Sequence, residues 1–260
     1  MVSTIDVPLR KLNEYCGVCA VSRTEGEAPP LVHRALIALQ HRGQEAAGIA
    51  SVGPNNEINS LRRRGLVSDC LPTYDVKKLQ GGNAIGHVRY STVALDKIEN
   101  IQPFLSNTPY GRLAIAHNGN LKNADALRQE LEQDGALLST PMDTELIVHL
   151  IARSGAENFH DALKYAASRM EGAYSLTIIC DGRVYGLRDP NGIRPLVLGS
   201  LSDGWVIASE TCALNAVGAT FTREIKRGEL IELTGNGTPK STQLLEPAQP
   251  AGCVFELVYF

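Results

Sequence analysis

The first residue that could do chemistry is a cysteine at the head of a short apolar run, in Tyr15-Cys16-Gly17-Val18-Cys19-Ala20-Val21. Residues 1–15, which precede it, are polar and loop-like. At the first position of a mature chain, its thiol could attack a carbonyl carbon. The freed α-amine could accept the thiol proton, because an α-amine ordinarily titrates near pH 8. We therefore predict that residues 1–15 are a leader and that cleavage between Tyr15 and Cys16 makes Cys16 the N-terminal residue.

Two other interpretations of Cys16 remain open at this point. An isolated cysteine most often packs in a core. The Cys16-Gly17-Val18-Cys19 spacing also matches a dithiol redox motif, which needs its first cysteine at a helix start, where the dipole lowers the thiol pKa. The flanking residues predict a strand instead, and alternate residues of a strand point to opposite faces. We therefore disfavour the redox pair and assign Cys19 to the core.

Three further groups place hydrogen-bond donors or charges at the ends of predicted elements. Asn118 and Gly119 follow a buried strand, where a side-chain amide and a backbone N–H could form an oxyanion hole. Arg89 ends another strand and could hold a carboxylate through two hydrogen bonds. Asp143 begins a helix and could bind an ammonium group. Each has an ordinary alternative: an Asn-Gly turn, a surface arginine and a helix N-terminal acid. Together with Cys16 they describe a site for an amino acid that carries a side-chain amide.

The elements that must position these residues form strands first, then a block of helices, then many strands. Hydrophobic periodicity and turn residues predict strands over 16–22, 46–52, 58–64, 84–89, 112–117, 174–180, 183–188, 196–198, 205–209, 221–225 and 230–233, and helices over 31–40, 123–133, 140–153, 159–170 and 210–217. The interval 235–251 reads as irregular. This order argues against a regularly alternating doubly wound fold. We predict an α+β protein with two antiparallel sheets and helices outside them.

Length and composition exclude several classes of function. The chain has 260 residues, 43% of them hydrophobic, and a formal net charge of −3. Such a charge favours neither nucleic acid nor an anionic membrane. No apolar run is long enough for a membrane span, and residues 1–15 lack the apolar core of a secretory signal. The six scattered cysteines predict reduced thiols in a cytoplasmic protein.

The sequence resembles the class II glutamine amidotransferase domain, an N-terminal-nucleophile hydrolase, and within that class the N-terminal half of the amidophosphoribosyltransferase family. The resemblance runs from Cys16 to Phe260. It rests on CGVCAV (16–21), LQHRGQEAAGI (39–49), GLVSD (65–69), GHVRYST (86–92), QPF (102–104), AHNGNL (116–121), DTE (143–145), GAYS (172–175), RDPNGIRPLVLG (188–199), ASE (208–210) and CVFELVYF (253–260).

The resemblance implies a four-layer αββα fold over residues 16–260 and a role for each site residue. Cys16 would attack the side-chain amide of glutamine and form a thioester, with Asn118 and Gly119 as the oxyanion hole. The remaining roles concern the bound substrate: Arg89 would hold its carboxylate, Asp143 its ammonium group, Thr92 would lie in a closing loop, and Arg42 and Gly43 would lie beside the new N-terminus. For RDPNGIRPL we expect a structural role, because Asp-Pro-Asn-Gly is a strong turn signal.

Two departures from the family pattern shape the functional hypothesis. The family usually has a glycine-rich stretch where this sequence has residues 93–100. Because these residues lack the backbone freedom of glycine, we expect the closing loop to be more restricted. No phosphoribosyltransferase domain follows residue 260 of this sequence, so we expect either a domain excised from a longer protein or a stand-alone amidase. In the second case the ammonia would pass to a synthase partner in trans. We expect no cofactor and no metal, including no iron–sulfur cluster at Cys253, because a lone cysteine is not a metal site.

Several alternatives stay open from sequence. The chain could hydrolyse a different amide as a stand-alone enzyme, or bind glutamine as a non-catalytic regulatory domain. A homo-oligomer is also left open, and the sequence does not name the acceptor of the ammonia.

Overall fold

The computed structural model describes residues 16–90, 98–253 and 256, and within them the strands form two antiparallel sheets. The strands of the first sheet are β1 Gly17–Arg23, β2 Ala46–Val52, β3 Ile58–Arg64, β4 Asn83–Arg89, β9 Val197–Leu201, β10 Gly204–Ala208 and β11 Thr220–Glu224, and their spatial order is β11-β9-β10-β1-β4-β2-β3. The strands of the second are β5 Phe104–Thr108, β6 Gly111–Leu121, β7 Gly172–Cys180, β8 Arg183–Arg188, β12 Glu229–Leu233 and β13 Lys240–Gln243, in the order β13-β12-β8-β7-β6-β5.

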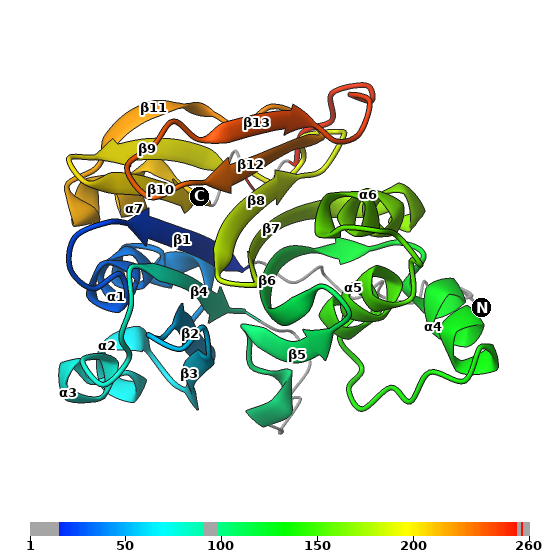
Figure 1. The fold of residues 1–260 in the computed structure, drawn as a ribbon, viewed down its shortest axis with the longest axis horizontal. Coiled ribbons are helices and arrows are strands. Elements are labelled where there is room, and N and C mark those ends of the chain that lie inside the picture. The colour runs from blue at the N-terminus through cyan, green and yellow to red at the C-terminus, as the bar shows by residue number, and fades with distance from the viewer. Residues whose placement is uncertain (1–15, 91–97, 254–255, 257–260) are drawn as a thin grey trace, which may run out of the picture.

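The helices cover the outer faces of the two sheets. They are α1 Pro29–Ala38, α2 Val67–Cys70, α3 Thr73–Val76, α4 Ala124–Gln133, α5 Asp143–Ala152, α6 Phe159–Arg169 and α7 Thr211–Val217, with single 3₁₀ turns η1 at Gln40–Arg42 and η2 at Ile98–Asn100. Helices α1 and α7 pack on each other and against the first sheet, whereas α5 lies on β5 and β6 of the second. Figure 1 shows the two groups of helices on opposite sides of the molecule, with the sheets between them.

Three hydrophobic clusters hold these layers together. One lies between the first sheet and α1, α2 and α7, a second between the second sheet and α4–α6, and a third between the two sheets. Strand β1 contributes to both sides of its sheet: Val18 and Ala20 face the space between the sheets, and Cys19 and Val21 face the helices. This alternation follows from the period of two along a strand. The predicted four-layer αββα architecture is therefore confirmed.

Most predicted elements are present, and three predictions are wrong in detail. Strand β6 continues through Asn118 and Gly119 to Leu121 instead of ending at His117. Helix α5 begins at Asp143, not at Thr140-Pro141, because Thr140 instead donates to the Glu145 carboxylate from its N–H and from its hydroxyl, at 2.7 and 2.8 Å. The interval 235–251, expected to be irregular, contains edge strand β13, which is exposed and therefore shows no apolar pattern.

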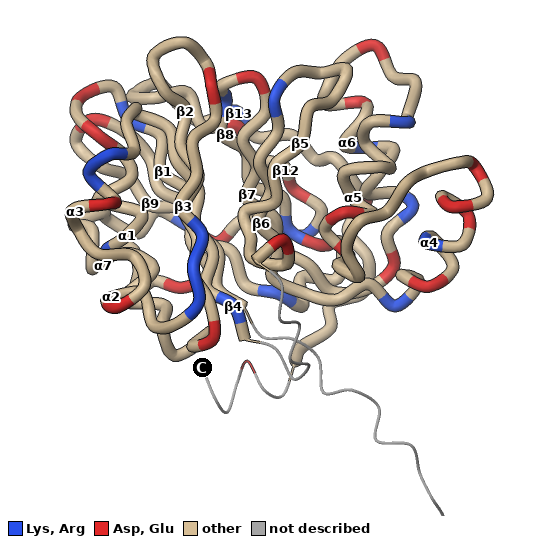
Figure 2. Tube along the Cα trace, turned by 90° about the horizontal axis from the view of Figure 1, so that it is seen from below, with Lys and Arg blue, Asp and Glu red and all other residues tan. Residues whose placement is uncertain are grey.

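The surface shows mixed charge. Figure 2 shows acidic and basic residues interspersed along the chain, with one continuous basic run, Arg62 to Arg64, on edge strand β3.

None of the described helices is long and apolar enough to cross a membrane. All six cysteines lie in the described residues and are free thiols.

Candidate active site

Cys16 lies directly before β1, and only 2% of its surface is exposed. Its nitrogen donates to Asn118 Oδ1 at 3.3 Å, and its carbonyl oxygen accepts from Arg42 Nε at 2.9 Å. The thiol lies 4.0 Å from the carbonyl oxygen of Tyr90, which follows β4. Three separate segments of chain thus hold the backbone and side chain of Cys16 at the end of the two sheets.

Asn118 lies on β6 and is fully buried. While its Oδ1 accepts from Cys16, its Nδ2 has no hydrogen-bond partner among the described residues. A buried amide N–H₂ without a partner is costly in a folded protein unless a ligand completes it. The arrangement leaves a donor on a side chain that contacts Cys16, and such a donor could stabilise an oxyanion.

Gly119 adopts φ +151°, a conformation that L residues with a side chain rarely adopt. A Cβ at this position would overlap the carbonyl group of Ala173 on β7. Glycine therefore allows β6 to continue past Asn118 in contact with β7, and the Asn-Gly pair is not the ordinary turn that was its alternative explanation. No local signal indicates that the strand continues here, because Asn-Gly is common in turns.

Two buried side chains fix the peptide groups immediately before Asn118. Gln102 Oε1 accepts from the N–H of His117 at 2.6 Å, and His87 Nε2 lies 3.2 Å from the carbonyl oxygen of His117. Burial, and next the charge of Arg89, lowers the pKa of His87 to about 3, so this imidazole is neutral. A neutral imidazole can donate to a carbonyl from one nitrogen only, and we assign that hydrogen to Nε2. The sequence offered no role for either residue.

Arg89 ends β4 next to Cys16, since Gly17 pairs with Val88. It is 5% exposed, and its Nη1 donates to the carbonyl oxygen of Asn100 in η2 at 3.0 Å. Gly43 packs on its backbone: a Cβ at Gly43 would lie 2.6 Å from the Arg89 carbonyl carbon. The φ of Gly43 is −166°, so Gly43 is not a left-handed helix cap, and close approach of two backbones is the reason for glycine here.

Asp143 is the first residue of α5, and its Oδ2 accepts from the N–H of Leu121 at 2.8 Å. This contact ties the helix start to the end of β6, two residues beyond Gly119. Burial raises the pKa of Asp143 above its ordinary value, and the Leu121 N–H opposes the shift. Its second oxygen could accept from a ligand ammonium, whose charge would compensate this buried carboxylate.

Cys19 takes no part in the site. It is fully buried in the cluster facing α1, and its thiol contacts the carbonyl oxygen of Val32 at 3.8 Å. Burial raises its thiol pKa far above the ordinary value. A buried protonated thiol on the helix-facing side of β1 does not form a redox pair with Cys16.

Arg42 lies beside Cys16 and is fully buried in a network of opposite charges. Its Nη1 pairs with Glu210, which immediately precedes α7, and its Nη2 lies 2.7 and 2.9 Å from the two carboxylate oxygens of Glu256. Burial acts to raise the pKa of Glu210, but Arg42 holds it below the ordinary value. The two glutamates occur in the ASE (208–210) and CVFELVYF (253–260) stretches, and the sequence alone suggested no function for either stretch.

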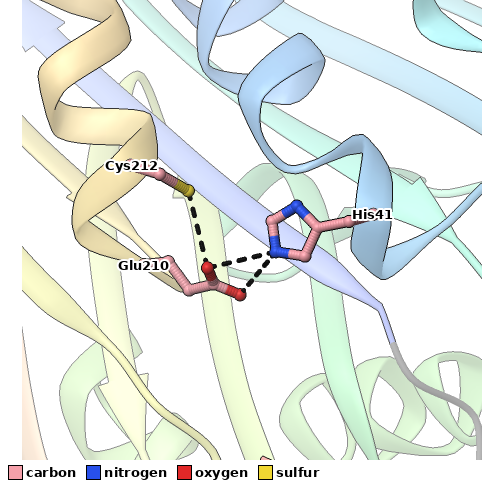
Figure 3. A group of neighbouring side chains, drawn as sticks. All are labelled: His41, Glu210 and Cys212. Carbon is pink, nitrogen blue, oxygen red and sulfur yellow. Dashed lines mark hydrogen bonds and ion pairs between the residues drawn. The ribbon is translucent and has the colours of Figure 1, made fainter. Parts of the chain in front are cut away.

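His41, Glu210 and Cys212 form the one group of metal-ligand types whose donor atoms lie within 4.8 Å of one another in the described part of the chain (Figure 3). The Cys212 thiol donates to Glu210 Oε2 at 3.5 Å, and burial, then the charge of Glu210, raises the pKa of Cys212 to about 11. His41 Nε2 lies 3.1 Å from both carboxylate oxygens. Because Glu210 already pairs with Arg42 and the thiol is protonated, we assign these residues to supporting Arg42.

The RDPNGIRPL stretch forms the expected turn and also contributes a charge to the site. The buried carboxylate of Asp189 accepts from the backbone N–H groups of Asn191, Ile193 and Arg194 at 3.0 to 3.2 Å. This turn directs Arg194 Nη1 to Glu256 Oε1, at 2.9 Å. The motif therefore connects to Arg42 through one shared carboxylate.

Two predicted site residues, Tyr15 and Thr92, lie outside the described residues, as do residues 93–97 of the predicted closing loop. Among the others, Cys16 is in direct contact with Asn118 and with Arg42. Arg89 is placed by the pairing of β1 and β4, and Asp143 by its bond to Leu121.

Several known proteins are similar to this chain. Residues 87–216 match the model of the glutamine amidotransferase domain family. Amidophosphoribosyltransferase 1, chloroplastic, of Arabidopsis thaliana is 42% identical over 251 residues, which is 96% of this chain and 44% of that protein. The amidophosphoribosyltransferase of Synechococcus elongatus is 45% identical over 95% of this chain and 51% of its own length.

The solved structures include a relative with the same fold. Glutamine phosphoribosylpyrophosphate amidotransferase from Bacillus subtilis, in complex with ADP and GMP, superposes with a TM-score of 0.86 at 39% identity. The match covers 93% of this chain and 52% of that one, so the chain spans about half the length of these relatives. The family match, the fold and the shared sequence lead to one conclusion: this chain belongs to the glutamine amidotransferase domain family.

Proposed function

We propose that the chain hydrolyses the side-chain amide of glutamine to glutamate and ammonia, with Cys16 as the nucleophile. The observation that carries the proposal is the position of the Asn118 side chain beside Cys16. Its Oδ1 accepts from the Cys16 nitrogen, and its buried Nδ2 remains as a donor without a partner among the described residues. One side chain thus orients the base and offers a donor to the developing oxyanion.

The reaction would proceed in two steps. The Cys16 α-amine takes the thiol proton, and the sulfur attacks the amide carbon to form a tetrahedral intermediate whose oxygen faces Asn118 and Gly119. The amine returns the proton to the leaving nitrogen, so ammonia departs and a thioester remains. Water then adds to the thioester, giving glutamate and regenerating the thiol. Arg89 and Asp143 would hold the carboxylate and ammonium groups of glutamine, and Thr92 would belong to the segment that closes over it.

The test of this function is the release of glutamate and ammonia from L-glutamine by the purified chain, with L-asparagine as the matched control. Asparagine has the same amide, ammonium and carboxylate, but its side chain is one methylene shorter. We expect at least a tenfold preference for glutamine, because a missing methylene displaces the amide from the thiol. Binding of glutamine without ammonia release would favour a regulatory domain, and faster hydrolysis of another amide would favour a different hydrolase.

We further propose that the ammonia is consumed by a phosphoribosyl-transferring synthase. The relatives named amidophosphoribosyltransferase are single polypeptides about twice as long as the matched region. They favour a synthase joined to this domain in one chain over the separate partner expected from the sequence. The free cysteines of the described residues also suit the reducing cytoplasm expected from the sequence.

Removal of the leader is a direct prediction of this mechanism. While Tyr15 is attached, the Cys16 nitrogen is an amide and cannot act as a base. We expect intact-mass measurement of the active protein to show a chain that begins at Cys16, with residues 1–15 lost by attack of the Cys16 thiol on the Tyr15 carbonyl. Efficient glutamine hydrolysis by a chain of full-length mass would contradict the role assigned to the α-amine.

A further inference from the structure

We propose that Glu256 is a positioning residue for the nucleophile, acting through Arg42. Its carboxylate bridges two buried guanidinium groups, Arg42 Nη2 at 2.7 and 2.9 Å and Arg194 Nη1 at 2.9 Å. The same Arg42 donates from Nε to the Cys16 carbonyl oxygen at 2.9 Å. A chain of three charged side chains therefore connects the RDPNGIRPL turn to the backbone of the nucleophile.

The bridge formed by Glu256 is buried, which strengthens the interactions between its charges. The side chains of Arg42, Arg194 and Glu256 are 0%, 3% and 11% exposed, so water screens their charges poorly. Both guanidinium groups contact the same oxygen, Glu256 Oε1, and would repel each other without it. Glu210 holds only the Nη1 side of Arg42. Glu256 thus holds the Nη2 side of Arg42 and contributes to the rotation of the guanidinium plane and, with it, to the direction of Nε toward Cys16.

The local charge balance has a second consequence. Arg42 and Arg194 carry two positive charges, Glu210 and Glu256 two negative charges, and Arg89 and half-exposed His41 lie nearby. Removing the negative charge of Glu256 makes the surroundings of Cys16 more positive. A more positive environment lowers the pKa of the Cys16 amine and favours the thiolate form of its side chain. Loss of Glu256 should therefore change the pH dependence of the reaction as well as its rate.

The experiment compares Glu256→Gln and Glu256→Asp with wild type in the full chain, measuring kcat and KM for glutamine between pH 5 and 9. This inference rests on the proposed function. For Glu256→Gln we expect kcat to fall about 10- to 100-fold with KM changed less than about threefold, because the groups assigned to glutamine binding are untouched. The acid limb of the pH profile should move to lower pH. Glu256→Asp keeps the charge, so it should retain the wild-type limb and recover part of kcat.

Glu229→Gln is the matched control, since Glu229 is a buried carboxylate on β12 that pairs with Arg223 at 2.7 and 2.8 Å, and its side-chain hydrogen-bond partners among the described residues do not include Arg42, Arg194 or Glu256. Equal losses in Glu256→Gln and Glu229→Gln, with unmoved acid limbs, would overturn the positioning role. The pH dependence of Cys16 alkylation by iodoacetamide, followed by peptide mass spectrometry, provides a readout without turnover. If wild type releases no ammonia, the proposed function fails, and an unshifted alkylation profile in Glu256→Gln would separately reject this inference.

Discussion

Replacing Cys16 by alanine is expected to lower the rate of glutamate release by at least about 10⁴-fold, because no other group can form the thioester. In the described residues, Cys16 is the cysteine that contacts Asn118 and Arg42, and its carbonyl and nitrogen are held at 2.9 and 3.3 Å. The same variant should keep its full-length mass, since the thiol is also assigned to leader removal. Glutamate release and intact mass are measured on the same preparation.

Cys19→Ala is the control for this prediction. Cys19 lies three residues further on in β1 and is fully buried against the α1 side of the sheet. Its loss creates a small cavity and should cost stability, on the order of 1 kcal/mol, while kcat stays within a few-fold of wild type. Activity retained in Cys16→Ala would reject the nucleophile, and activity lost in both variants without unfolding would revive the dithiol alternative.

Replacing Asn118 by aspartate has the second-largest expected effect, a loss of about 10²- to 10³-fold in kcat. Aspartate keeps an acceptor for the Cys16 nitrogen, which lies 3.3 Å from Asn118 Oδ1, but it lacks the Nδ2 donor. It also puts a negative charge where negative charge develops on the substrate oxygen. The steady-state rate over a range of pH measures both effects.

The pH profile distinguishes this explanation from misfolding. A carboxylate beside the Cys16 amine stabilises its protonated form, so the acid limb of kcat/KM should move up by about one pH unit or more. Asn118→Ala removes acceptor and donor without adding charge and should lose rate without that upward shift. Wild-type rates in Asn118→Asp, or equal acid limbs in the two variants, would show that Asn118 does not serve the oxyanion and the amine together.

Elements defined by neighbouring residues could be predicted from the sequence, whereas the ends of elements that depend on contacts between distant residues could not. Strands β2 and β3 have the predicted bounds, since the Gly-Pro-Asn-Asn turn at 53–56 that separates them is a local signal. The end of β6 was misplaced because it depends on the contact of Gly119 with Ala173, a residue on another strand. The start of α5 was misplaced because Thr140 binds Glu145 instead of capping the helix.

The residues that could do the chemistry are identifiable from sequence, because thiol, amide, guanidinium and carboxylate functions belong to residue types, and the motifs that contain them are short. How these residues act together depends on the folded chain. It brings the Cys16 nitrogen to Asn118 across 102 residues and Glu256 to Arg42 across 214. No local pattern encodes such pairings, since they arise when two sheets pack and bury polar groups that must then find partners. The folded structure therefore places Glu210, Glu256 and Arg194 in the site, whereas Cys16 could be identified from the sequence.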